Sequence, residues 1–276
     1  VADFIPYVVA RADRFEKEAG NPFTATGRSN HLDAGLDGKI GLTNNLTLDF
    51  TINPDFGQVE ADPSQVNLTS FETFFLEKRP FFIEGKNILS FPLMFGDGDL
   101  ASENLFYSRR IGRRPHYSPD LEGNEYMKAP DFTSILGAAK ITGKTKTGWS
   151  VGVLESLTSE EFARISDGTE RKEMIEPFTN YTIGRLQKDF NKGNTFIGGM
   201  FTSVNRKLVE DQLDYLHKSA YTGGFDFTHK WHNKDWQFDF STYFSRVEGS
   251  AEAITNTQKS WIHGFQRPDA SYLKLD

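Results

Sequence analysis

The sequence contains no cysteine, which excludes disulfide bonds, thiolate catalysis and cysteine-based metal sites. It also contains no continuous apolar run near the length of about 18 residues that a transmembrane helix requires. If this chain spans a membrane, it must do so as a closed β-barrel, because only helices and closed barrels satisfy their own backbone groups in lipid. No signal peptide precedes the strand-like residues that begin at Val1, so we expect a mature or trimmed product.

Hydrophobic residues are scarce, whereas aromatic residues are plentiful. The hydrophobic share is 37% and the aromatic share is 14% of the 276 residues. Ordinary globular domains reach roughly 45–50% apolar residues. This combination suits a wall with one apolar and one wet face, and it also suits a soluble β-sandwich. The formal net charge of −7 argues against nucleic acid as a partner.

Alternation of apolar and polar residues is the strongest signal in the sequence. From Leu32 to Leu42 every second residue is apolar or small, and the pattern resumes at Leu46 after a polar turn. Similar pairs of segments follow over 134–154, 180–204 and 221–245. A strand in a parallel sheet would be apolar on both faces, so the pattern predicts antiparallel hairpins with one wet face.

The connections between these segments alternate in length. Because alternate connections of an up-and-down sheet lie at the same rim, the sequence predicts one rim of short turns and one rim of long loops, as in outer-membrane barrels. Trp149, Trp231 and Trp236 adjoin short turns, where an aromatic girdle would meet the membrane interface. Short turns are predicted near 43–45, 143–148, 191–194 and 232–235, and long polar segments over 54–131, 155–178, 205–219 and from 247 onward.

The predicted fold is therefore all-β, an antiparallel transmembrane β-barrel of up-and-down hairpins that occupies residues 1–276. The strands are expected to run for about ten residues, near the 9–11 of a tilted membrane strand. Alternation divides their side chains between lipid and lumen. The residues expected to face lipid are Leu46, Leu48, Phe50, Phe225, Phe227, Phe238 and Phe240, and those expected to face the lumen are Asp33, Asp37, Lys39, Asp49, Asp226 and Asp239.

The segment 54–131 breaks the alternation and is too long for an ordinary structureless loop. Asp62-Pro63-Ser64 is a plausible helix start, and apolar residues between 66 and 75 would form one face of a short helix. We interpret this segment as an insertion that fills or caps the barrel lumen. A gating plug or a ligand-contacting element is the functional alternative.

Parts of the insertion carry a family resemblance. The runs NPDFGQVEADP (53–63), FETFF (71–75), EKRPFFIEG (77–85) and YSRRIG (107–112), with Gln266-Arg267-Pro268 near the end, resemble a family of uncharacterised bacterial outer-membrane proteins. Members usually join an N-terminal carbohydrate-binding family-nine-like domain to a C-terminal β-barrel. That domain has no counterpart here, and the family's barrels continue past the last residues of this sequence. The resemblance therefore implies a portion of a larger barrel, whose total strand number stays open.

Charged residues are the candidate chemistry of the insertion. Paired carboxylates at a suitable separation could hydrolyse a glycoside, but salt bridges in a wet lumen, with arginine holding carboxylates bidentately, are favoured. The basic run from Arg109-Arg110 to Arg113-Arg114 could contact anionic lipopolysaccharide or another polyanion. Asp97-Gly98-Asp99 is interpreted as a polar turn rather than a calcium site, and His229 and His232 are not expected to share a metal. The candidate cluster comprises Glu60, Asp62, Glu72, Glu77, Arg79, Glu84, Arg109, Arg110, Arg113 and Arg114.

The favoured function is that of a non-enzymatic protein of the Gram-negative outer membrane, acting in transport, surface binding or envelope assembly. The expected partners are outer-membrane lipid and lipopolysaccharide, with other envelope proteins or a glycan as further candidates. No cofactor, metal or catalytic residue is expected, because the common hydrolase and nucleotide-binding motifs are missing. The alternatives are an envelope glycan hydrolase or carbohydrate-binding protein, and a soluble β-rich interaction module.

Overall fold

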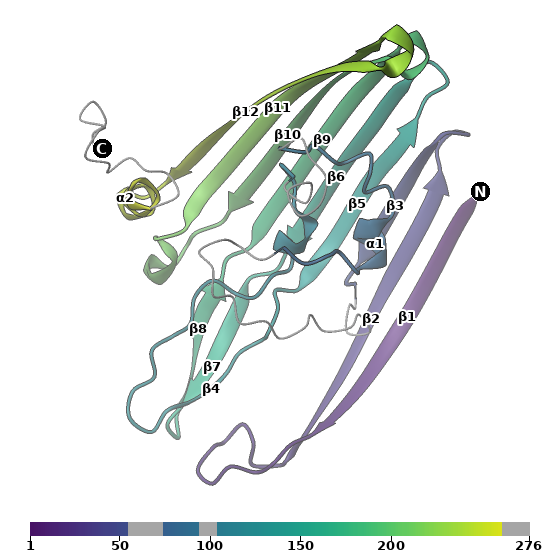
Figure 1. Cartoon of the computed structure of the whole chain (residues 1–276). Helices are drawn as coiled ribbons and strands as arrows, with labels where there is room; N and C mark the ends of the chain where they lie inside the picture. The colour runs from purple at the N-terminus through teal and green to yellow at the C-terminus, as the bar shows by residue number, and fades with distance from the viewer. Residues whose placement is uncertain (55–73, 94–103, 261–276) are drawn as a thin grey trace.

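The computed structural model describes residues 1–54, 74–93 and 104–260, and it confirms an all-β, antiparallel architecture. Nine strands form one large sheet in the order β1-β2-β3-β5-β6-β9-β10-β11-β12 (Figure 1). Each neighbouring pair is antiparallel. The strands are β1 (Ala2–Arg14), β2 (Arg28–Gly41), β3 (Leu46–Ile52), β5 (Ile135–Lys144), β6 (Trp149–Thr158), β9 (Thr179–Phe190), β10 (Thr195–Arg206), β11 (His217–Trp231) and β12 (Trp236–Gly249).

A smaller sheet and a few helical turns complete the described structure. The strands β4 (Tyr126–Lys128), β7 (Glu161–Ser166) and β8 (Glu170–Glu176) form a three-stranded sheet. The helix α2 (Ala251–Lys259) follows β12, and its N-cap Ser250 accepts a hydrogen bond from the backbone N–H of Ala253. The remaining turns are α1 (Pro80–Ile83), η2 (Ser108–Arg110), η3 (Asn191–Gly193), η4 (Asp211–Leu213) and η5 (His232–Lys234).

Short and long connections lie at opposite rims of the large sheet. Figure 1 shows the turns β2–β3, β5–β6, β9–β10 and β11–β12 at one end of the strands and the β1–β2, β6–β9 and β10–β11 connections at the other. The predicted sorting of loops therefore holds. One detail was wrong: the segment 155–178 is not a loop, because β6 continues to Thr158 and residues 161–176 pair as the hairpin β7–β8. Polar residues dominate this hairpin and hide its alternation.

The described residues form an open sheet and not a closed barrel. β1 and β12 stand at its two edges, and neither pairs with the other. Strand lengths in the large sheet range from 7 residues in β3 to 15 in β11, so several of its strands are longer than predicted. The helix predicted after Asp62 and the turn Asp97-Gly98-Asp99 lie outside the described residues.

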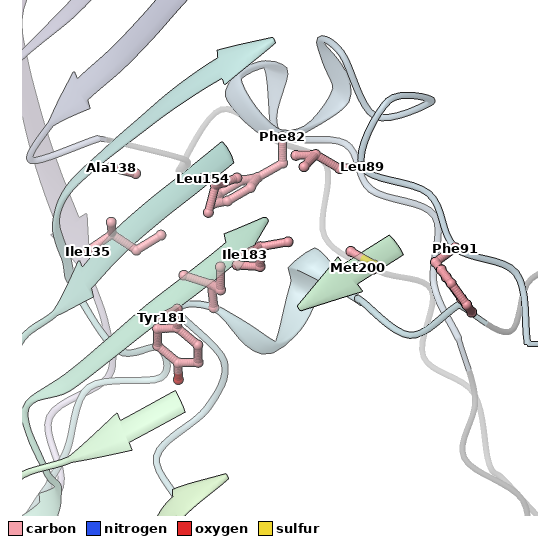
Figure 2. Close-up of a cluster of buried hydrophobic side chains, with 10 residues drawn as sticks. Phe82, Leu89, Phe91, Ile135, Ala138, Leu154, Tyr181, Ile183 and Met200 are labelled. Atoms are coloured by element: carbon pink, nitrogen blue, oxygen red, sulfur yellow. The ribbon is translucent and has the colours of Figure 1, made fainter. Parts of the chain in front are cut away.

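The main hydrophobic core lies between the insertion and one face of the large sheet. Phe82, Leu89 and Phe91 from the insertion pack against the sheet (Figure 2). We call this covered face of the sheet the inner face and the opposite face the outer face. The sheet residues of the core are Ile135, Ala138, Leu154, Tyr181, Ile183 and Met200.

Candidate functional site: the two faces of the large sheet

The inner face collects the charged residues of the strands. The predicted polar residues share this face, because Asp37 pairs with Thr51, Lys39 with Asp49, and Asp49 with Lys140 across neighbouring strands. Directly paired residues of an antiparallel sheet point to the same side. Asp226 lies on the same face at the other end of the sheet, since Arg185 donates two hydrogen bonds of 2.5 and 2.8 Å to it. Asp239 shares that face, because its cross-strand partner Thr228 is two residues from Asp226 on β11.

Two lysines join the sheet to the insertion. Lys39 on β2 forms an ion pair with Glu84 of the insertion and lies 3.7 Å from Asp49. Lys140 on β5 is only 1% exposed. Its Nζ donates to the carbonyl oxygens of Phe81 and, at 2.6 Å, of Glu84. These carbonyls end the single turn of α1, where cations are favoured because the last carbonyls have no partner within the helix.

The buried Arg79 joins the two described segments of the insertion, 74–93 and 104–131, to each other. Arg79 donates from Nε to Oε1 of Glu77 at 2.8 Å and from NH2 to Oε2 at 2.7 Å, a bidentate pair. The same guanidinium donates to the carbonyls of Ser108 at 2.8 Å and Ile111 at 2.7 Å. The Ser108 hydroxyl completes the cluster with a 2.5 Å hydrogen bond to Glu77. We call Glu77, Arg79, Ser108 and Ile111 the neck.

The protonation state of the neck follows from these contacts. Burial by itself would raise the pKa of Glu77, but the hydrogen bonds and charge of Arg79 outweigh burial, and the pKa lies below its ordinary value. Glu77 is therefore a carboxylate whose two oxygens are already occupied. It is unsuited to general acid chemistry, which needs a raised pKa and access to substrate.

Residues 79–93, which we call the strap, cross five strands along a single row of paired residues. That row reads Thr142, Gly152, Arg185, Met200 and Gly224. Ile88 and Leu89 lie over Gly152, where a Cβ atom would come within 2.7 Å of the Leu89 side chain. Phe91 lies over Gly224, where a Cβ atom would meet the ring at 2.5 Å.

Small residues on the sheet thus act as seats for the strap. Phe91 is 1% exposed, and the guanidinium of Arg185 lies 5.1 Å from its ring centroid. Gly85 packs on Thr142, and its φ of +70° lies in the left-handed region that favours glycine. The contact between strap and sheet therefore depends on glycine on both sides: Gly85 in the strap, and Gly152 and Gly224 in the sheet.

The outer face is apolar over most of its height. Phe225, Phe238 and Phe240 are 42%, 53% and 47% exposed on this face, and Phe227 pairs with Phe240. At the other end of the sheet, Leu46, Leu48 and Phe50 are half-buried on the same face and pair with Gly143, Ile141 and Ala139. The seven residues predicted to face lipid therefore share one face of the sheet.

Aromatic and cationic side chains border the apolar outer face at the short-turn rim. Trp231 stacks on His229 at 5.7 Å and on Trp236 at 6.4 Å between ring centroids. The ammonium of Lys188 lies 5.2 Å from the Trp149 ring. Amphipathic rings of this kind are favoured where an apolar phase meets water.

Polar side chains border the apolar outer face toward the long-loop rim. One row of paired residues reads Glu155, Thr182, Ser203, Tyr221 and Arg246. Asn180 donates to Glu155, and the Tyr221 hydroxyl donates to Asn205 at 3.0 Å. The apolar surface on β9–β12 is therefore a band with an aromatic and cationic border at the short-turn rim and a polar border toward the long-loop rim.

Contacts above the long-loop rim tie the connections to each other. The buried carboxylate of Glu176 accepts from the backbone N–H of His116 at 2.9 Å and contacts Nδ1 of the same residue at 2.7 Å. The Tyr215 hydroxyl donates to the His116 carbonyl at 2.9 Å, and burial followed by the charge of Glu176 raises the pKa of Tyr215. These contacts hold the insertion, β8 and the β10–β11 connection together.

The predicted charge cluster is divided among several places. Glu77 and Arg79 meet in the neck, whereas Glu84 reaches the sheet at Lys39. Arg109 donates to the carbonyl of Leu76 at 3.3 Å, and Arg110, Arg113 and Arg114 are exposed. Glu60, Asp62 and Glu72 lie outside the described residues.

Sequence reasoning missed Lys140 and Arg185. Both occupy inner-face positions in the alternation of their strands, which was the available signal, but neither had a partner that the sequence could identify. In the part of the chain that the structure describes, no helix is long and apolar enough to cross a membrane. Within the same residues, no group of three or more histidine or acidic side chains could hold a metal ion.

Comparison with known families assigns the chain to one of them. A family model described as a domain of unknown function (DUF5916) matches residues 2–267. The chain belongs to this family. The DUF5916 match includes every strand of both sheets, as well as the neck and the strap. No curated protein and no solved structure matches the sequence.

Proposed function

We propose that this chain forms part of the wall of an outer-membrane β-barrel, that the insertion occupies the lumen, and that the protein acts in transport, surface binding or envelope assembly without catalysis. The observation that carries the proposal is the asymmetry of the sheet. An apolar band covers one face, and on the other face charged residues, among them the buried Lys140, contact the insertion. Outer-membrane barrels have this apolar outside and polar inside.

The height of the apolar band supports this reading. On β12 the outer face is apolar or aromatic at Trp236, Phe238, Phe240 and Phe244, with Thr242 between them, and it ends at Arg246. From Trp236 to Phe244 the strand advances roughly 26 Å at about 3.3 Å per residue. With a tilt of about 40° this spans roughly 20 Å, close to the band of about 25 Å that such barrels present to lipid.

The alternative of a glycan hydrolase finds little support among the described carboxylates. Glu77 is held by Arg79 and Ser108, and Glu84 by Lys39. A glycosidase needs two carboxyl groups facing an open cleft. The alternative of a soluble module requires that the apolar band be covered by protein, whereas the band is exposed in the described residues.

Site-directed labelling tests the proposal, and the cysteine-free sequence makes single labels unambiguous. Cysteines placed one at a time from 220 to 231 in β11 carry a nitroxide in protein reconstituted into liposomes. We expect accessibility to oxygen, which concentrates in lipid, at Phe225→Cys and Phe227→Cys. Accessibility to a water-soluble nickel reagent is expected at Thr228→Cys, the matched control on the inner face.

Two results would contradict the proposal. One is accessibility to the water-soluble reagent at every position of β11, without the period of two. The other is a monomeric protein that remains soluble without detergent, because a lipid-facing band of this height would aggregate in water.

A further inference from the structure

We propose that the strap, residues 79–93, is a gate that separates as one unit from the inner face and closes a passage along it. This inference rests on the proposed function, because a passage exists only if the sheet is part of a barrel. Three kinds of contact support this inference: those within the strap, those between the strap and the sheet, and those within the sheet.

The strap is closed on itself at the neck. Four hydrogen bonds from Arg79 reach Glu77, Ser108 and Ile111, so residues 29 and 32 positions away in the sequence are bound to the start of the strap. Further along, the backbone N–H of Leu105 donates to the carbonyl of Phe91 at 3.0 Å. Because these contacts do not involve the large sheet, the strap can separate from the sheet while the hydrogen bonds of the neck stay formed.

The hydrogen bonds, the ion pair and the packing contacts that join the strap to the sheet each involve at least one side chain. Among the described residues, no hydrogen bond between main-chain groups joins 79–93 to a strand of the large sheet. Neighbouring strands of the wall, in contrast, are paired over as many as 14 residues, as in β11 and β12. Separation of the strap therefore costs no strand pairing.

The polar attachment of the strap to β2 and β5 uses the charge of two lysines. Lys39 holds Glu84, and Lys140 holds the carbonyls of Phe81 and Glu84. Water can replace each of these contacts once the strap lifts, because every group involved is charged or strongly polar. At the far side Phe91 simply rests on Gly224, beside Arg185. The closed position is thus held by polar contacts at one side, by the fit of Phe91 on Gly224 at the other, and between them by the hydrophobic core that Phe82 and Leu89 share with the sheet, which opening must expose.

The inner face also retains buried groups that the closed arrangement leaves without partners. The hydroxyls of Thr51 and Ser156 are buried and have no hydrogen-bond partner among the described residues. Both lie on the row next to that of Asp49 and Lys140. Water that enters when the strap lifts would satisfy them, which lowers the cost of opening.

An engineered disulfide tests the gate. A Cβ atom at Gly85 would lie 3.2 Å from Cβ of Thr142, close to the spacing of about 3.5–4.5 Å in disulfides. Gly85→Cys with Thr142→Cys therefore ties the strap to β5. Thr202→Cys with Thr222→Cys is the matched control, because these hydroxyls touch at 2.5 Å and join β10 to β11 without the strap.

Conductance is measured in planar bilayers, and hydrogen exchange of residues 79–93 is measured in detergent. We expect the double variant Lys39→Met, Lys140→Met to speed exchange of the strap at least about tenfold, as loss of charge-assisted hydrogen bonds should, without changing β10. The same variant should conduct more often than the native protein. Adding the oxidised Gly85–Thr142 lock should abolish both effects, and reductant should restore them, whereas the control pair should change neither.

The outcomes separate this inference from the proposed function. Unchanged exchange of the strap in the double variant, or equal conductance with the lock oxidised and reduced, overturns the gate. Absence of conductance in every variant also overturns it, even where the nitroxide labels on β11 report lipid. Labels that report water throughout β11 overturn the proposed function itself.

Discussion

Arg79 and Lys140 show how single residues hold the insertion in place. Each is buried, and each uses its charge on main-chain carbonyls of a segment that has little regular structure of its own. Such carbonyls would otherwise be buried without partners, which costs about 1–3 kcal/mol each. These residues therefore replace the ladder hydrogen bonds that the strands have and the insertion lacks.

At this scale, the neck predicts a pH dependence. The lowered pKa of Glu77 means that its contribution to stability is fully present above its ordinary pKa of 4.5 and is lost as pH falls through the lowered value of the folded protein. Glu77→Gln leaves Arg79 buried without its carboxylate, and we expect a loss of about 3 kcal/mol at pH 7. The difference between variant and native protein should shrink below pH 4.5.

Denaturant unfolding in detergent at several pH values measures this difference. Glu170→Gln is the control, since its partner Arg164 is exposed and the pair should contribute nothing measurable. A difference between native protein and Glu77→Gln that stays constant between pH 7 and pH 3 would refute the role given to Glu77.

The seat at Gly224 predicts a steric effect. A Cβ atom there would lie 2.5 Å from the Phe91 ring, so Gly224→Ala should destabilise the protein by about 1–3 kcal/mol, as overpacking does. Gly184→Ala is the matched control in the same sheet, because a Cβ atom there has nothing within 4 Å. Phe91→Leu should recover part of the stability lost in Gly224→Ala, whereas the same substitution in the native protein should not stabilise it. A double-mutant cycle measures this difference.

At the scale of elements, two hairpins use the same turn. Asn191, Lys192 and Gly193 have φ of 52°, 54° and 84°, and the residues His232, Asn233 and Lys234 repeat these values at 52°, 58° and 73°. Lys234 thus occupies the position that glycine has in the sister turn. Left-handed backbone is costly for a residue with a Cβ atom.

The turn comparison predicts a stabilising substitution. Lys234→Gly should raise the free energy of unfolding by about 1 kcal/mol, because the relief of left-handed strain exceeds the entropy that glycine adds to the unfolded chain. Gly193→Lys should lower it by a similar amount. Unfolding of both variants in detergent measures the pair, and a change of the same sign in both would contradict the explanation.

At the scale of the whole molecule, the apolar band predicts a depth profile. Phe225 lies midway between the aromatic row at Trp231 and the polar border. If the band is in lipid, Phe225→Arg should cost about 2–4 kcal/mol and Trp236→Arg at the rim about 0–1 kcal/mol. Ser241→Arg, on the inner face, is the control. Equal costs at Phe225 and Trp236 in liposome-reconstituted protein would speak against a membrane-spanning band.

Much of the large sheet was predictable from the sequence because strand geometry is local. Successive side chains of a strand point to opposite faces, so the alternation from Leu32 to Ile52 and from Tyr221 to Ser245 assigns each residue to a face without knowledge of its partner. Alternation failed over 161–176, where charged residues occupy both faces of a small hairpin. The sequence did not reveal those strands, because alternation of apolar and polar residues reports which side chains are buried and not the conformation of the backbone.

The sequence by itself determined an antiparallel sheet, which residues share a face, and which rim carries the short turns. Only the tertiary structure decided where the insertion lies and what holds it. The contact of Phe91 with Gly224 joins residues 133 positions apart, and Lys140 meets Phe81 across 59. Gly224, which contacts the Phe91 ring, and Gly184, which has open space above it, cannot be distinguished in the sequence, because they differ only in the neighbour that folding places beside them.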